Sequence, residues 1–346
     1  MTALKKLLVC EFITGGGVSH QTLPESLANE GMLMRDALLR DLNELKQYAL
    51  TVMCDFRLMP SPYAAQHLVV QAGEFESTFK KALKNVDLVW LIAPETDGIL
   101  ISLAEVCLAN EENETMPTYI GCGFDATLIG TSKSLTFEAL QKANIHTLPV
   151  YADEDLMNES FFKSLTALKV QKWVAKPEDG AGCEGIFLFD TLLNLRDWLK
   201  HDQRCLNYLA QPFQSGLSAS FSFLCAGNQA WLLCANQQLI VSDGQTFKLT
   251  GIIVNGMLPY WQRFETLMRK LIKVLPDAMG YIGVDVIIDP TTEHIYVIDI
   301  NPRLSSSYIG LSQAIGHNLA KIILDCLLDS HFKMPLLQKN VIEVKF

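Results

Sequence analysis

The stretch that decides the fold lies at residues 280–303 and reads Gly-Tyr-Ile-Gly-Val-Asp-Val-Ile-Ile-Asp-Pro-Thr-Thr-Glu-His-Ile-Tyr-Val-Ile-Asp-Ile-Asn-Pro-Arg. Two runs rich in valine and isoleucine, residues 281–288 and 294–300, flank the turn-forming cluster Asp-Pro-Thr-Thr and predict a β-hairpin. Side chains alternate between the two faces of a strand. Asp285 is therefore expected opposite the apolar face of the first strand. Asp299 and Asn301 are expected on one side of the second.

These three side chains offer two carboxylates and an amide, all of them hard oxygen donors. Such donors suit Mg²⁺, with Mn²⁺ as an alternative, and Mg²⁺ is typically held by one or two carboxylates together with nucleotide phosphates. We therefore predict a metal site at Asp285, Asp299 and Asn301, with Arg303 facing a phosphate oxygen. The alternative is that Asp285 pairs with a lysine and that the rest is only a strand end.

Composition limits the classes of protein to consider. The chain has 346 residues, 49% hydrophobic and 19% charged, which is typical of a globular protein with about two or three domains. A net charge of −10 disfavours nucleic acid or an anionic membrane as the main partner, because both usually require a basic patch, whereas ATP needs only a few local cations.

Location is also suggested by the sequence. The apolar run at residues 7–10 is interrupted by Glu11, so no signal peptide is expected, and no stretch approaches the ~20 apolar residues of a membrane helix. Nine cysteines without a Cys-x-x-Cys pair favour reduced thiols. We therefore expect a cytoplasmic protein.

The first third of the chain predicts a parallel sheet. Expected strands alternate with expected helices, the strands at residues 6–12, 48–54, 86–92 and 118–122 and the helices at 29–45, 75–84 and 98–109. This alternation is typical of a doubly wound α/β domain, in which ligands bind beyond the carboxyl ends of the strands. Glu11 and Glu95 fall there and are candidates for binding a substrate, with solvated loop acids as the alternative.

Glycines 15–17 follow the first expected strand. A glycine-rich turn there can bind a nucleotide, but G-x-G-x-x-G is absent and no helical pattern starts at once. We favour a flexible loop lining a cleft over a dinucleotide site.

Two lysines precede features that can bind phosphate. Lys133 lies at the expected N-terminus of a helix that ends at Ala143, capped by Ser132 or Thr131, although a lone lysine can also be an ordinary surface residue. Lys176 closes an expected strand at residues 172–176.

The segment after Lys176 is rich in glycine. Gly180 and Gly182 would let backbone N–H groups approach phosphates closely. Three nearby acids would repel phosphates, and a plain hairpin turn is the alternative; the acids are Glu178, Asp179 and Glu184.

At these residues the chain resembles the ATP-grasp ligases. Asp285 followed by Asp-Ile-Asn-Pro-Arg at 299–303 looks like the magnesium-binding end of that family, which more often carries Glu at the position of Asp299. Lys133 and Lys176 fall where the family places its nucleotide-binding lysines. The resemblance implies adenine near Gln211 and Phe213, and Ser218 where many members carry an acid for the ribose hydroxyls.

The resemblance also implies an architecture that combines α/β and α+β parts. An N-terminal doubly wound pre-ATP-grasp domain is expected at residues 1–122, a small lobe with the glycine-rich loop at 123–210, and a C-terminal lobe with the metal site at 211–346.

A narrower resemblance spans nearly the whole chain, to the tyramine–glutamate ligase branch of methanofuran-type cofactor biosynthesis. It rests on Cys-Glu-Phe-Ile-Thr-Gly-Gly-Gly at 10–17, Glu-Gly-Met at 30–32, Ala-Pro-Glu-Thr-Asp at 93–97 and Lys-Pro-Glu-Asp-Gly-Ala-Gly-Cys at 176–183. It implies that ATP phosphorylates a glutamate carboxylate and that tyramine or tyrosine displaces the phosphate to give an amide. Lys176 and Arg303 would be the catalytic side chains, and Glu11 or Glu95 would hold the amine.

Two other functions stay open. A dinucleotide-dependent oxidoreductase using glycines 15–17 would leave Asp285, Asp299 and Asn301 unexplained. A non-catalytic nucleotide sensor on the same fold is compatible with Ser218 and Asp299. The expected small-molecule partners are ATP, glutamate and an amine; the oligomeric state stays open, with a homodimer among the alternatives.

Overall fold

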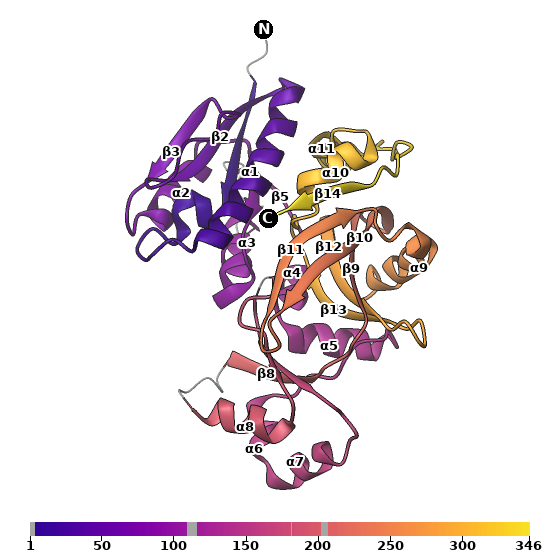
Figure 1. Ribbon diagram of the computed structural model, residues 1–346. Coiled ribbons are helices and arrows are strands. Elements are labelled where there is room, and N and C mark those ends of the chain that lie inside the picture. The colour runs from indigo at the N-terminus through magenta and orange to yellow at the C-terminus, as the bar shows by residue number, and fades with distance from the viewer. Residues whose placement is uncertain (1–3, 109–115, 181, 202–206) are drawn as a thin grey trace.

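The computed structural model describes residues 4–108, 116–180, 182–201 and 207–346. These residues form three β-sheets with their covering helices. In Figure 1 the N-terminal domain and the small lobe lie at opposite ends of the molecule, with a six-stranded sheet between them. The mixture of a parallel sheet with antiparallel lobes confirms the predicted fold class.

The N-terminal domain is a five-stranded sheet, parallel throughout, with the strand order β3-β2-β1-β4-β5. Its strands are β1 (Lys5–Glu11), β2 (Tyr48–Asp55), β3 (Gln66–Val70), β4 (Leu88–Ile92) and β5 (Thr118–Ile120), and its helices are α1 (Glu25–Leu45), α2 (Phe75–Leu83) and α3 (Ile99–Leu108). The chain builds outward from β1 to β3 and then returns to β4, so the direction of winding switches between β1 and β4. Ligands of such sheets bind at this switch point, and Glu11 and Glu95 lie there, at the end of β1 and just beyond β4.

The C-terminal lobe is built on a six-stranded antiparallel sheet with the order β13-β12-β9-β10-β11-β14. Its strands are β9 (Leu217–Ala226), β10 (Gln229–Ser242), β11 (Phe247–Val254), β12 (Gly280–Ile288), β13 (Ile295–Asn301) and β14 (Ile342–Lys345). On one face, Ile282, Val284 and Val286 of β12 share a core with Phe221 and Phe264. This is the face predicted to be apolar.

Helices cover the C-terminal lobe. α4 (Phe124–Thr131), α5 (Lys133–Lys142) and α9 (Trp261–Leu271) contribute Ala126, Leu140 and Phe264 to the core described above. α10 (Tyr308–Ile315) and α11 (Leu319–Leu328) instead share a second core with α1 of the N-terminal domain. That contact is also polar, because Asp41 of α1 accepts hydrogen bonds from Tyr308 Oη at 3.1 Å and Ser312 Oγ at 2.5 Å.

The small lobe has its own sheet and its own core. Its sheet has the order β7-β6-β8 and is antiparallel, with β6 (Trp173–Pro177), β7 (Phe187–Phe189) and β8 (Tyr208–Pro212). Its helices within the described residues are α6 (Asp153–Met157), α7 (Glu159–Thr166) and α8 (Leu192–Lys200). Leu156, Phe162, Trp173, Leu195 and Ala210 are buried together here. The boundaries predicted at residues 122 and 210 remain predictions.

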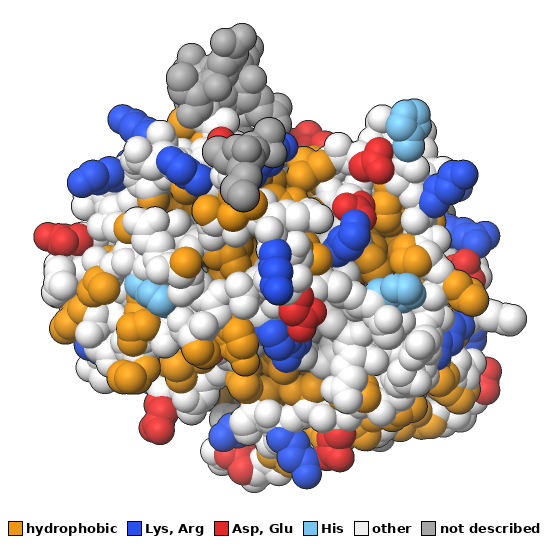
Figure 2. Space-filling model, turned by 90° about the horizontal axis from the view of Figure 1, so that it is seen from above, with side chains coloured by type: hydrophobic (Ala, Val, Ile, Leu, Met, Phe, Trp, Pro, Cys, Tyr) orange, Lys and Arg blue, Asp and Glu red, His pale blue; other side chains and the backbone are white. Residues whose placement is uncertain are grey.

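Three further features of the described residues are the surface charge, the character of the helices and the state of the cysteines. On the face shown in Figure 2, basic and acidic side chains are interspersed. No helix in the described ranges has both the length and the apolar character needed to cross a membrane. The eight described cysteines are free thiols. The cytoplasmic location and the exclusion of nucleic acid remain predictions from composition.

Candidate active site

A β-bulge brings the two carboxylates of the hairpin together. Asp285 lies opposite Asp299 and Gly283 opposite Asn301, but Val286 lies opposite Val297, so Ile298 is the extra residue of the bulge. If the register of Val286 opposite Val297 continued without a bulge, Asp285 would face Ile298 instead of Asp299. Asn301 Nδ2 donates to Asp285 Oδ2 at 3.0 Å. The three predicted metal ligands therefore lie side by side.

The electrostatics of this cluster suit a cation. Burial, and then the charge of Asp299, raise the pKa of Asp285 to about 6. Its Oδ1 also accepts from Gln238 Nε2 at 2.7 Å. A divalent cation would relieve the repulsion between the two carboxylates, and the donors are hard oxygens, so these residues fit Mg²⁺ or Mn²⁺. Within the described ranges, no three His, Cys, Asp or Glu side chains gather into a metal site. Mg²⁺ usually completes its shell with water and phosphate oxygens, which suits a site with two carboxylates and an amide.

Two buried lysines face the same cluster. Lys133 Nζ lies 3.6 Å from Asp299 Oδ1 and donates to the Gly180 carbonyl at 3.3 Å. Lys133 is 7% exposed and Lys176 is 3% exposed, so the alternative that Lys133 is an ordinary surface residue is wrong. Burial lowers the pKa of Lys176 to about 8, with Asp299 raising it and Lys133 lowering it. Two adjacent buried ammonium groups favour an anion between them.

Glu178 and Asp179, two of the acids beside the glycine-rich segment, have hydrogen-bond partners of their own. Glu178 accepts from Ser132 Oγ, from Ser134 Oγ at 2.8 Å and from the Ser134 N–H at 3.2 Å, so it lies on the N-terminus of α5. Asp179 accepts from the Gly98 N–H at 3.1 Å. Their repulsion of a phosphate is therefore weaker than the sequence suggested, because these donors compensate part of the negative charge.

The predicted adenine and ribose residues lie where the small lobe joins the C-terminal lobe. Gln211 lies opposite Val174 on β6, two residues before Lys176, and its Nε2 donates to the Leu148 carbonyl at 3.3 Å. The Phe213 ring stacks on Phe247 with centroids 6.1 Å apart. Ser218 lies opposite Ile287 on β12.

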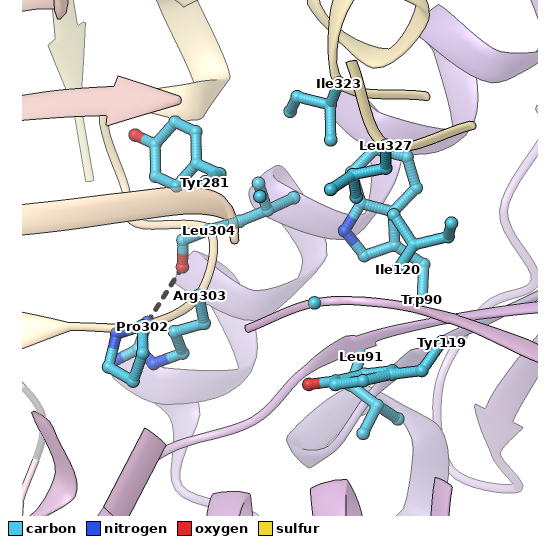
Figure 3. A pocket seen from close by; sticks show the side chains of 12 residues that line it. Trp90, Leu91, Tyr119, Ile120, Tyr281, Pro302, Arg303, Leu304, Ile323 and Leu327 are labelled. Carbon is cyan, nitrogen blue, oxygen red and sulfur yellow. Dashed lines mark hydrogen bonds between the residues drawn. The ribbon is translucent and has the colours of Figure 1, made fainter. Parts of the chain in front are cut away.

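Arg303 is fixed by the N-terminal domain. Its Nε donates to Glu95 Oε1 at 2.8 Å and its Nη2 to Glu95 Oε2 at 2.7 Å. Its Nη1 donates to the Leu304 carbonyl at 3.0 Å (Figure 3). Glu95 is 2% exposed, so the alternative of a solvated loop acid is wrong for this residue.

Glu11 is also buried. It accepts from the Thr14 N–H at 2.6 Å and the Ile13 N–H at 3.3 Å, and burial raises its pKa. Gly31 of α1 lies directly over it, since a Cβ at Gly31 would be 2.7 Å from Glu11 Oε2. The alternative of a solvated acid is wrong here as well.

The glycines after β1 form a packed turn. Residues Ile13–Gly17 make one turn of π-helix, and Gly15 and Gly16 are buried in it. Gly16 has a φ of 95°, and a Cβ there would lie 2.6 Å from Val70 Cβ. The expectation of a flexible loop lining a cleft is therefore wrong; close packing against β3 explains the glycine.

A small cavity lies between the N-terminal domain and the C-terminal lobe. Figure 3 shows aromatic and aliphatic side chains around it, including Trp90, Tyr119, Tyr281, Leu304 and Leu327. Its volume is about 10 Å³, room for about one water molecule. This cavity cannot hold the ring of a substrate.

Sequence reasoning missed two contacts of the site. Gln238, which donates to Asp285, lies in the polar half of β10. The apolar run that indicates this strand in the sequence, Ala-Trp-Leu-Leu-Cys at residues 230–234, ends before it. Ser306 Oγ donates to Glu30 Oε1 and connects the segment after Arg303 to α1. A polar strand end and a serine triplet carry no local signal that could have revealed either contact.

Two antiparallel lobes beside a doubly wound domain, with buried lysines facing a carboxylate hairpin, define the ATP-grasp class of proteins. The sequence model of the ATP-grasp domain matches residues 131–307, more than half of the chain. A model of the pre ATP-grasp 3 domain matches residues 48–115. The chain belongs to the ATP-grasp family.

Individual relatives narrow the comparison. The chain is 28% identical over 314 residues to tyramine–L-glutamate ligase of Methanocaldococcus jannaschii, covering 89% of this chain and 85% of the relative. The enzyme of the same name from Methanocaldococcus fervens is 27% identical over 293 residues, covering 83% of this chain and 84% of the relative.

Solved structures show the same fold at lower identity. Biotin carboxylase from Campylobacter jejuni superposes with a TM-score of 0.73 at 12% identity, over 98% of this chain and 74% of that one. L-amino acid ligase from Bacillus licheniformis gives a TM-score of 0.65 at 16% identity, over 94% of this chain and 75% of that one.

Proposed function

We propose that this protein is an ADP-forming ligase that joins a carboxylate of glutamate to the amino group of tyramine or tyrosine. The observation that carries the ligase chemistry is the pair of buried lysines facing the paired carboxylates of the β12–β13 hairpin. The substrate pair rests on the similarity to two tyramine–L-glutamate ligases along most of both chains.

The nucleotide would bind between the two lobes. Lys133 and Lys176 would contact its phosphates, and Gln211, Phe213 and Ser218 its adenosine. Asp285, Asp299 and Asn301 would hold Mg²⁺, which would neutralise charge on the phosphate oxygens. The N–H groups at Gly180 and Gly182 would approach the same phosphates. Gly182 has a φ of 65°, and no atom lies within 4 Å of the position that a Cβ would take there.

The reaction needs no protein nucleophile. A carboxylate oxygen of glutamate attacks the γ-phosphorus, the bond to ADP breaks, and an acyl phosphate forms. The amine nitrogen then attacks the acyl carbon, phosphate leaves and the amine loses a proton. Catalysis in this scheme is positioning and charge neutralisation, with Lys176 and Arg303 facing the transferred phosphoryl group.

A mass-spectrometric assay tests the proposal. ATP, Mg²⁺ and glutamate are mixed with tyramine or tyrosine, and the expected products are ADP, phosphate and a glutamyl amide. AMP with pyrophosphate would move the chain to another class of ligase. ADP release with a different substrate pair, and no glutamyl amide, would refute the substrate assignment. No ADP release with any amino acid or amine would favour a nucleotide sensor.

A further inference from the structure

The turn between β4 and α3 contacts both sides of the nucleotide site. Glu95 pairs with Arg303, which follows β13 of the C-terminal lobe. The Gly98 N–H donates to Asp179 Oδ2, which follows β6 of the small lobe. Four residues of the N-terminal domain therefore reach the two parts of the chain that flank the predicted phosphates.

The backbone of this turn has an unusual conformation. Asp97 and Gly98 have φ values of 54° and 65°, both in the left-handed region, where an L-residue such as Asp97 is strained. The Gly98 N–H also lies 3.1 Å from the Glu95 carbonyl, so one tight turn fixes both Glu95 and the donor to Asp179. Such strain persists where surrounding contacts hold it, frequently at functional sites.

Glu95 orients Arg303 without using all of its donors. A guanidinium has five N–H donors. Within the described residues, Glu95 takes two of them and the Leu304 carbonyl takes one. One N–H on Nη1 and one on Nη2 remain, and these can donate hydrogen bonds to a phosphoryl group.

By contrast, the burial of Glu95 and its pairing with Arg303 make it poorly suited to bind an amine. Each of its oxygens already accepts from a charged donor, and the residue is 2% exposed. Arg303 also compensates its charge, so a substrate ammonium would gain little from it.

We infer that Glu95 is a positioning residue that acts through Arg303, and that the turn at residues 95–98 also holds the glycine-rich segment through Asp179. This inference rests on the proposed ligase function. It replaces the expectation that Glu95 binds the amine.

A double-mutant cycle tests the Glu95 part. Glu95→Gln, Arg303→Gln and the double variant are compared with wild type by ADP formation, in single turnovers where rates are low. Glu95→Gln should lower kcat about 100-fold, the effect of a misplaced catalytic group, and leave KM for the amine within about twofold. In the Arg303→Gln background, Glu95→Gln should lower kcat by less than about a further threefold, because there is no guanidinium left to orient.

Two results would overturn this part of the inference. A raised KM for the amine with unchanged kcat would show that Glu95 binds the substrate. If the kcat losses of the two single variants multiply in the double variant, Glu95 acts independently of Arg303. Glu105→Gln, exposed on α3 of the same domain, is the control and should behave as wild type.

Asp179 gives an independent test if Glu95→Gln does not fold. Asp179→Ala removes the acceptor for Gly98 and should raise KM for ATP about tenfold, the size expected for losing one charge-assisted hydrogen bond. Asp179→Asn keeps an acceptor oxygen and should recover most of the loss. Asp190→Ala, on a carboxylate of the same lobe that is 81% exposed, should change nothing. A wild-type KM for ATP in Asp179→Ala, or an equally raised KM in Asp179→Asn, would show that the hydrogen bond between Gly98 and Asp179 does not support ATP binding.

All of these assays follow ADP rather than one particular amide. If another substrate pair is turned over, the glutamate–amine assignment fails, and the cycle is measured with that pair. Failure of the proposed function and failure of this inference therefore give different results.

Discussion

Replacing Asp285 by asparagine should stabilise the metal-free protein and weaken its stabilisation by Mg²⁺. Burial and Asp299 raise the pKa of Asp285 from an ordinary 3.8 to about 6. At about 1.4 kcal/mol per pKa unit, the ionised form costs about 3 kcal/mol in the folded state. The side chain is partly exposed, so we discount this to about 1–2 kcal/mol.

The expected gain depends on pH. Folding raises the pKa of Asp285, so the free-energy cost of its ionised form is fully present above about pH 6. This cost is absent below about pH 4, where the carboxyl is protonated in both the folded and the unfolded protein. The advantage of Asp285→Asn should therefore disappear as the pH falls from 6 to 4. Asparagine can still accept from Gln238 or Asn301 through its oxygen.

Thermal melting with a chelator, with and without Mg²⁺ and ADP, measures both effects. Without metal at about pH 7, the variant should melt about 1–3 °C above wild type. Mg²⁺ with ADP should raise the melting temperature of wild type and raise that of the variant less. Asp289→Asn in the turn of the same hairpin is the control. The Thr291 N–H and then Thr292 lower the pKa of Asp289, so this variant should gain nothing. A metal-free Asp285→Asn protein less stable than wild type at neutral pH would show that ionised Asp285 does not destabilise the fold.

Three further predictions concern activity and packing. Asp299→Asn should abolish turnover with little change in melting temperature, because the phosphates lose a metal ligand; wild-type ADP release would contradict the metal site. KM for ATP should rise above about pH 8, where Lys176 loses its proton, and a flat profile from pH 7 to 9 would exclude the lysine from phosphate binding. Gly31→Ala should destabilise the protein by about 1–3 kcal/mol in denaturant melts, because its Cβ would lie 2.7 Å from Glu11 Oε2. Asn29→Ala, on the exposed side of α1, should leave the stability unchanged. Equal stability of the two variants would contradict the close packing of Gly31 against Glu11.

Elements with a local signal are predictable from the amino-acid sequence. Alternation along residues 281–288 predicts which face of β12 is apolar, because side chains on a strand alternate whatever the strand pairs with. The sequence predicts Ser132 or Thr131 as a helix cap, and Ser132 is the cap, since its Oγ accepts from the Leu135 N–H at 3.1 Å. Elements without such a pattern were missed. β3, at the edge of its sheet, is half exposed and begins Gln-His, and β14 is four residues long.

The tertiary structure alone decided how the site is assembled. Whether Asp285 faces Asp299 or Ile298 depends on a one-residue bulge, and the sequence of β13 is compatible with either register. Glu95 and Arg303 are 208 residues apart, and their pairing exists only because the N-terminal sheet lies against the C-terminal lobe. Both carboxylates at the switch point were predicted from their strands, but their burial was not. A side chain's solvent exposure depends on which distant segments cover it, and for Glu11 that cover is a glycine of α1.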